Sequence, residues 1–248
     1  MKFSILTTFC TACALVCGTA APAVAQGNLA AEVLADAARQ QRFVFVLFWK
    51  QNDAAMDAVA RSLGTHMAKC SSQATSIAVQ VTDPAQQVLV QRFKGDRAPM
   101  PLVLAVAPNG AVTGAFQAPL TAEQVDGALV SPAMANCMRA MQDGKLVLML
   151  VHPRNDAQPP AGAQQFLNNT HFRQRTAFVR LVSSQSAEAR TLRQLGLTSQ
   201  DASGCVVLMA PPSSMVGKFP LNVSGNHLAA KLHAAGKCCN DPNCKHNQ

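Results

Sequence analysis

Tyrosine and tryptophan, two of the residues that stack on nucleic-acid bases, are almost absent from this sequence. The 248 residues include no tyrosine and a single tryptophan. Proteins that hold single-stranded nucleic acids combine a basic groove with aromatic side chains on which the bases stack. Basic residues are present, since Lys and Arg number 21 against 13 Asp and Glu, but tyrosine and tryptophan are nearly missing. The composition therefore argues against a nucleic-acid partner.

Acidic residues are scarce in the second half of the chain, where a group of five arginines has only Glu188 near it in sequence. A run of this kind is typical of a solvated helix face. It also suits attraction to an acidic surface such as an anionic envelope polymer. Both interpretations stay open at the level of sequence. The five arginines are Arg173, Arg175, Arg180, Arg190 and Arg193.

Motifs of several familiar enzyme classes are missing as well. The chain has no glycine-rich phosphate loop, no H-E-x-x-H and no G-x-S-x-G, which argues against phosphate-loop, zinc-protease and serine-hydrolase chemistry. Single histidines at positions 66, 152 and 171 have no spacing typical of metal ligands. Catalysis of these kinds is not predicted.

No apolar run reaches the 18 residues that a membrane-spanning helix needs. The N-terminus has instead Lys2, an apolar or small stretch over residues 3–17, and Ala23-Val24-Ala25 before Gln26. This order is typical of a secretory signal peptide with an A-x-A cleavage site. We expect residues 1–25 to be removed and the mature protein to be exported, to the periplasm or the extracellular space, without a membrane span.

Six cysteines remain once the signal peptide is removed, and an oxidising compartment permits disulfides among them. Cys137 and Cys205 stand among apolar neighbours, which predicts small buried side chains rather than reactive thiols. The other four are Cys70, Cys238, Cys239 and Cys244.

The chain contains an internal repeat at an offset of 103 residues. Strand cores and turn residues recur in one register, which predicts two copies of one domain, at 26–130 and 134–234, joined near Ser131-Pro132. Matched residues include Val44 with Val147, Val79 with Val182, Val103 with Val206, Ala107-Pro108 with Ala210-Pro211, and Gly114-x-Phe116 with Gly217-x-Phe219.

Each copy shows the same order of predicted elements. A short helix precedes a β-α-β-α-β-β-α series, and the central strands are continuous apolar runs of the kind found in sheets buried on both faces. The pattern predicts an α/β fold with a mixed sheet covered by helices. In the first copy the helices are expected at 29–40, 54–70, after Asp83-Pro84 and after Thr121, and the strands at 43–49, 77–81, 102–107 and through Phe116.

Three stretches of the first copy carry a family resemblance. They are Phe48-Trp49 at the end of the first strand, D-P-A-Q-Q-V-L-V-Q-R-F at 83–93, and A-P-M-P-L-V-L-A-V-A-P-N-G at 98–110. The chain resembles the thioredoxin-like superfamily, and in particular exported bacterial proteins with tandem thioredoxin-like domains. The resemblance implies two such domains, each a mixed central sheet flanked by helices. It also implies that Pro101 matches the cis-proline beside the family's active site.

The departures from that family concern its chemistry. Thiol–disulfide exchange needs a thiolate and a resolving thiol, but the first copy offers Asp53 and Met56 and the second offers Asp156, without sulfur nucleophiles. We expect both aspartates to cap the helices that follow them. Trp49 either packs in the core or contacts a partner in a groove.

The end of the chain, residues 235–248, is rich in potential ligands. Three thiols and an imidazole form a soft ligand set that suits Cu(I) or Zn(II). A disulfide from Cys238 or Cys239 to Cys244 across the Asp241-Pro242-Asn243 turn is an equal alternative, and a tail without either role is a third. The four potential ligands are Cys238, Cys239, Cys244 and His246.

Two functional hypotheses follow. The first is a non-enzymatic exported scaffold that binds a protein partner and carries a thiol tail. The alternative is a thiol–disulfide oxidoreductase that works through the C-terminal cysteines. The sequence favours the first, because both dithiol positions lack cysteine.

Overall fold

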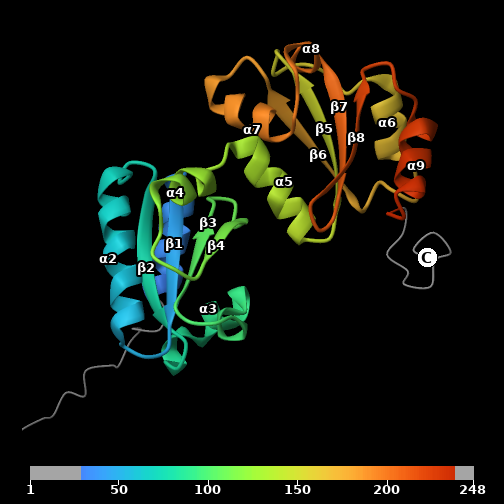
Figure 1. Ribbon diagram of the computed structural model, residues 1–248. Helices are drawn as coiled ribbons and strands as arrows, with labels where there is room; N and C mark the ends of the chain where they lie inside the picture. The colour runs from blue at the N-terminus through green and yellow to red at the C-terminus, as the bar shows by residue number, and fades with distance from the viewer. Residues whose placement is uncertain (1–28, 238–248) are drawn as a thin grey trace, which may run out of the picture.

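The computed structural model describes residues 29–237. These residues form two four-stranded sheets that share no strand, each flanked by helices (Figure 1). We call residues 29–131 the first domain and residues 132–237 the second. The predicted signal peptide and the cysteine-rich tail from Cys238 lie outside the described residues. No helix within 29–237 has the length and apolar character to cross a membrane.

The first domain follows the predicted order. Its elements are α1 (Leu29–Arg39), β1 (Phe43–Trp49), α2 (Ala54–Lys69), β2 (Ala74–Gln80), the 3₁₀ turn η2 (Pro84–Gln86), α3 (Gln87–Phe93), the 3₁₀ turn η3 (Gly95–Arg97), β3 (Leu102–Val106), β4 (Val112–Phe116) and α4 (Ala122–Ala128).

The second domain repeats this order with a short additional helix before its third strand. Its elements are α5 (Pro132–Gln142), β5 (Leu146–His152), α6 (Ala161–Asn168), β6 (Thr176–Val182), the 3₁₀ turn η4 (Ser186–Glu188), α7 (Ala189–Gln194), α8 (Ser199–Ala202), β7 (Cys205–Ala210), β8 (Ser214–Pro220) and α9 (Gly225–Ala234).

Both sheets are mixed, as the element order predicted. The strand orders are β2-β1-β3-β4 and β6-β5-β7-β8. In each sheet the first two strands of the domain pair in parallel, and the remaining pairs are antiparallel. The parallel pair needs a crossover, which α2 supplies in the first domain and α6 in the second.

The apolar run of β1 is buried on both faces of its sheet because side chains alternate along a strand. Val44, Val46 and Phe48 join a cluster with residues of α1 and α3, while Phe45 and Leu47 face residues of α2 and α4. Strand β5 divides its side chains in the same way. A continuous apolar run is therefore the pattern expected of a strand with helices on both sides.

The strand register refines the repeat. Phe48 lies opposite Leu102, and Val151 lies opposite Cys205, which preserves the offset of 103. The parallel strands break it, because Phe48 pairs with Val79 whereas Val151 pairs with Leu181. The ungapped alignment of Val79 with Val182 was therefore wrong by one residue. The connection from β5 to β6 is one residue shorter than that from β1 to β2, and the offset is restored before β7.

The repeated Gly-x-Phe has a packing reason. A Cβ atom on Gly114 would lie 2.6 Å from Cζ of Phe116, and one on Gly217 would lie 2.8 Å from Cζ of Phe219. Each phenyl ring thus covers the glycine two residues before it, on the same face of the strand. A β-bulge sits at the matching place in both hairpins.

Helix α5 joins the two domains (Figure 1). Cys137 and Met141 on one side of it are buried in the second domain's core. Ala135 on another side packs with Ala107 and Ala111 of the first domain. One helix therefore belongs to both cores.

The last turn of α5 also binds the first sheet. The side-chain amide of Gln142 accepts a hydrogen bond from the N–H of Val112 at 3.0 Å and donates one to its C=O at 2.7 Å. The amide pairs with the outer edge of β4 as a neighbouring strand would. Polar contacts thus add to the apolar ones that hold the two domains in one arrangement.

Candidate functional site

The first domain has Trp49 and Pro101 at neighbouring strand ends, where the sequence resemblance predicts a dithiol site. Because Phe48 pairs with Leu102, Trp49 lies beside Pro101 at the neighbouring strand end. Pro101 is buried, and the Met100–Pro101 peptide bond is cis. Trp49 is half-buried, and the clusters on the two faces of the first sheet do not include it, so the aromatic core residue here is Phe48.

The residues at the dithiol positions of this domain have structural roles. Asp53 is the N-cap of α2, and its Oδ1 accepts a hydrogen bond from the Met56 N–H at 2.9 Å. This confirms the prediction that it caps the helix. Met56 is half-buried against the cluster under α2. Neither side chain offers a thiol for exchange.

The second domain has neither the tryptophan nor the proline at the matching positions. The pairing of Val151 with Cys205 places His152 beside Gly204, where the first domain has Trp49 and Pro101. The Cδ2 atom of His152 lies 3.7 Å from the position that a Cβ on Gly204 would take. The cis bond of this domain is elsewhere, at Pro211–Pro212 before β8, and was not expected from sequence.

Asp156 does not cap a helix, contrary to our prediction. Helix α6 begins at Ala161 with Pro160 as its N-cap, and no side chain makes the capping bond. Asp156 pairs instead with Arg154, through distances of 2.9 Å to Nε and 2.6 Å to Nη2. This hydrogen-bonded pairing lowers the pKa of Asp156. The proline-rich connection to α6 places Asp156 too far ahead of the helix to reach its first turn.

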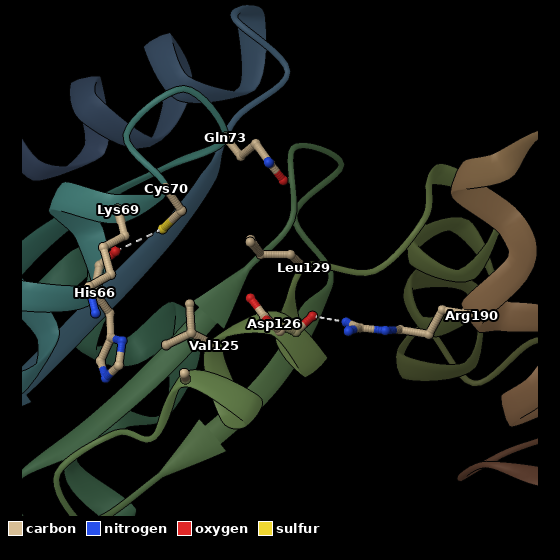
Figure 2. Close-up of a pocket in the computed structure, with 9 residues that line it drawn as sticks. His66, Lys69, Cys70, Gln73, Val125, Asp126, Leu129 and Arg190 are labelled. Carbon is tan, nitrogen blue, oxygen red and sulfur yellow. Dashed lines mark hydrogen bonds between the residues drawn. The ribbon is translucent and has the colours of Figure 1, made fainter.

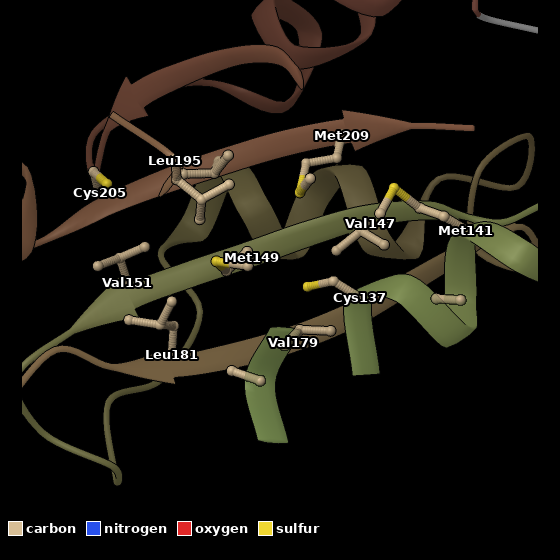
Figure 3. Close-up of a cluster of buried hydrophobic side chains, with 13 residues drawn as sticks. Cys137, Met141, Val147, Met149, Val151, Val179, Leu181, Leu195, Cys205 and Met209 are labelled. Carbon is tan, nitrogen blue, oxygen red and sulfur yellow. The ribbon is translucent and has the colours of Figure 1, made fainter. Parts of the chain in front are cut away.

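The three described cysteines are free thiols. Cys137 and Cys205 are buried in one cluster with Met149 and Val151, as predicted from their apolar neighbours (Figure 3). Burial raises the pKa of Cys137 to about 12 and that of Cys205 to about 11. Thiols with such pKa values are protonated at neutral pH and are poor nucleophiles.

Cys70 follows α2 and is half-buried. Its Sγ donates a hydrogen bond to the His66 carbonyl oxygen at 3.2 Å. Partial burial raises the pKa of the Cys70 thiol, and the negative charge of Asp126 raises it further. A raised pKa is the opposite of what an activated cysteine needs.

A cavity of about 430 Å³ opens beside Cys70 at the junction of the domains (Figure 2). Its size lies within the range of small-molecule sites. Arg190 of α7 crosses the junction and donates a hydrogen bond to the backbone carbonyl of Asp126. The cavity is lined by charged side chains of both signs and by apolar side chains. Its lining residues are His66, Lys69, Cys70, Gln73, Ala122, Val125, Asp126, Leu129 and Arg190.

Sequence reasoning missed this cavity, because its residues come from three helices and from both copies of the repeat. No run or spacing in the sequence links Lys69 to Arg190. Within residues 29–237 no group of three or more His, Cys, Asp or Glu side chains has an arrangement that would hold a metal ion. The predicted ligands Cys238, Cys239, Cys244 and His246 lie outside the described residues.

Comparison with known proteins was made at the level of sequence and of structure. No family model and no curated protein matches the sequence. Human ERp44 is similar in structure, with 10% identity and a TM-score of 0.38 over 84% of this chain and 56% of that one. A disulphide isomerase from Xylella fastidiosa shows 16% identity and a TM-score of 0.31 over 44% of this chain and 84% of its own.

A two-domain structure is also similar. The first two thioredoxin domains of Eps1p from Naumovozyma dairenensis share 11% identity and give a TM-score of 0.25 over 74% of this chain and 86% of that one. Identities this low concern the fold alone. The assignment therefore rests on the chain's own strand order, with its parallel crossover, its antiparallel hairpin and its helices on both faces of the sheet.

Both domains have a thioredoxin-like fold. The first domain has a capped helix and a buried proline at the positions that the sequence resemblance assigns to a dithiol site, but no thiol there. The second thioredoxin-like domain retains only the topology. Since fold does not fix function, what the pair does has to be argued from its sites.

Proposed function

We propose that this chain is an exported, non-enzymatic binding scaffold built of two thioredoxin-like domains. The observation that carries the proposal is the state of the dithiol positions. Asp53 is used as a helix cap, Met56 as a packing residue and Asp156 in an ion pair. Each of these side chains has a structural role, and none of them is a thiol.

The described thiols support the same conclusion. Cys137 and Cys205 are buried, and Cys70 is bonded to a helix carbonyl. All three have raised pKa values, whereas a working thiol of this fold needs a lowered one.

The junction supports a binding role. Helix α5 and Gln142 hold the domains together, and the cavity beside Cys70 takes residues from both. A ligand there would contact both domains at once. Lys69, Arg190 and Asp126 favour a polar ligand with charged groups, and we place the scaffold's small-ligand site in this cavity.

The competing function is an oxidoreductase that uses Cys238, Cys239 and Cys244. These residues are in the sequence, but no contact of theirs is described. The two functions differ in where activity would reside, because the scaffold needs no tail and the oxidoreductase depends on it.

An insulin-reduction assay separates them. Three proteins are compared: the chain from Gln26 to its end, the same chain ended at Gly236, and the full chain with D53C and M56C. The double variant restores C-x-x-C at the start of α2, where the helix N-terminus lowers a thiol pKa. We expect no turnover from the first two and turnover from the third. Turnover by the first but not the second would establish the tail oxidoreductase, and turnover by the first two alike would end the non-enzymatic proposal.

A further inference from the structure

The two domains share one fold but carry very different charge. The first domain has eight Lys and Arg residues and eight Asp and Glu residues, so its formal net charge is zero. The second has eleven Lys and Arg residues and four Asp and Glu residues, a net charge of +7. The whole positive excess of the described chain therefore belongs to the second domain.

The acidic residues of the second domain are already neutralised. Asp143 pairs with Arg139 at 3.1 Å and Asp156 with Arg154 at 2.6 Å. Asp201 pairs with Lys218 at 2.8 Å.

The fourth acidic residue, Glu188, is 3% exposed. The described surface of this domain thus shows no carboxylate outside an ion pair. Seven cations have no carboxylate within ion-pair distance among residues 29–237: Lys145, Arg173, Arg180, Arg190, Arg193, Lys231 and Lys237.

Part of this charge follows one edge of the second sheet. Strand β6 is an edge strand, with Arg180 exposed on it and Arg173 exposed in the loop before it. Lys145 is exposed immediately before Leu146, whose N–H donates to the carbonyl oxygen of Arg175 at 2.8 Å. No Asp or Glu occurs from residue 157 to residue 187. We call Lys145, Arg173, Arg175 and Arg180 the basic edge.

The fold does not require these arginines. In the second domain Leu150 lies opposite Arg180. In the first domain the equivalent residue, Leu47, lies opposite Ala78, so an alanine takes the place of Arg180. By the same register, Arg173 corresponds to Ser71 of the first domain and Arg175 corresponds to Gln73. Strand β2 of the first domain has no charged residue. The edge strand can therefore be built without cations, as the first domain builds it.

The guanidinium of Arg180 is held on the surface. Its Cζ lies 5.0 Å from the centroid of the Phe178 ring, and its Nε donates to the Ala157 carbonyl oxygen at 3.4 Å. Its two terminal nitrogens have no protein partner among the described residues. A positioned guanidinium with two donors left suits a carboxylate or sulfate oxygen pair.

We infer that the basic edge of the second domain binds an acidic polysaccharide. The extended strand from Thr176, which follows Arg175, to Arg180 runs about 13 Å, so Arg180 lies well apart from the cations that precede the strand. That spacing suits a polymer with a repeated negative charge better than one small anion. The second domain has no tryptophan or tyrosine, and the phenylalanine of the basic edge, Phe178, is half-buried with the Arg180 guanidinium over its ring, which disfavours stacking by single-stranded nucleic acid. Attraction of this kind acts through the field of the whole domain and is screened by salt.

The test uses the full mature chain and polygalacturonate, a linear polyuronate, as the probe. Binding is measured by isothermal titration at low ionic strength and at about 0.15 M salt. One variant carries R173Q and R180Q. The control carries R61Q and R97Q, which remove the same charge from exposed positions of the first domain. Circular dichroism melting of both variants checks that they remain folded.

We expect the basic-edge variant to lose about tenfold or more in affinity and most of its salt dependence, while the control loses less than about twofold. An equal loss of affinity in both variants would show that binding depends only on the net charge of the protein, which would overturn the inference. So would the absence of binding by the native chain at about 0.15 M salt. A homopolymeric single-stranded DNA of equal charge that binds more tightly than polygalacturonate would overturn the polysaccharide assignment.

Discussion

The side-chain hydroxyl of Ser131 lies 2.9 Å from that of Thr191, sixty residues later in the chain, and both residues are buried. Ser131 also caps α5 by accepting a hydrogen bond from the Met134 N–H at 3.2 Å. The residue at the joint between the domains is thus hydrogen-bonded to α7. In the first domain the corresponding helix is α3.

Replacing Thr191 with Val should destabilise the protein by about 1–2 kcal/mol, because the Ser131 hydroxyl loses its buried partner. T191S is the matched variant, since it keeps the hydroxyl and loses only a methyl group. Urea unfolding would measure both. A T191V protein as stable as T191S would show that the hydroxyl pair contributes nothing.

Gly162 allows α6 and the start of α9 to meet. A Cβ at this position would lie 1.8 Å from the carbonyl oxygen of Val223, a backbone atom that cannot rotate away. G162A should therefore cost about 1–3 kcal/mol or more, as overpacking does. Gly127 in α4 has nothing within 4 Å of the same built atom, so G127A should stabilise by about 0.5 kcal/mol. We expect G162A to lower the melting temperature and G127A to raise it. A G162A protein as stable as the native one would contradict the close approach of Gly162 to Val223.

The buried Cys137 thiol should make stability fall at high pH. Its pKa is about 12 in the folded protein against an ordinary 9.0. Above pH 9 the unfolded chain loses this proton and the folded chain keeps it. The free energy of unfolding then decreases, by at most about 1.4 kcal/mol per pH unit, until the folded pKa is reached.

The C137A variant removes this titration. Its absolute stability will differ because a cavity forms, but its slope between pH 9 and 11 should be shallower than that of the native protein. Denaturant melts at several pH values in this window measure the slope. Parallel slopes for the two proteins would show that Cys137 titrates alike in the folded and unfolded chain.

The tail remains a prediction from sequence. If Cys238, Cys239, Cys244 and His246 hold Cu(I) or Zn(II), the reduced full-length chain should bind one ion and the chain ended at Gly236 none. Thiolates must lose protons to bind, so affinity should fall as the pH drops. Elemental analysis after dialysis measures the stoichiometry. Equal metal in both proteins, or none in either, would exclude these ligands and leave a disulfide-closed turn or an idle end as the alternatives.

Local patterns in the sequence determined much of this protein. The apolar run at 43–49 became β1 because alternate side chains have helices to face on both sides. Thr121 and Asp53 became helix caps because capping depends on a few consecutive residues. The Gly-x-Phe repeat marked two equivalent hairpins, since the ring packs on its own glycine.

Tertiary structure decided the rest. The one-residue shift of β6 is invisible in an ungapped alignment, because strand pairing, and not sequence distance, sets the register. Asp156 was misassigned because a proline-rich connection delays α6. The Ser131–Thr191 pair, the cavity between Lys69 and Arg190 and the shared role of α5 join residues far apart in the chain. Such contacts depend on how whole elements pack, which no local pattern of residues encodes.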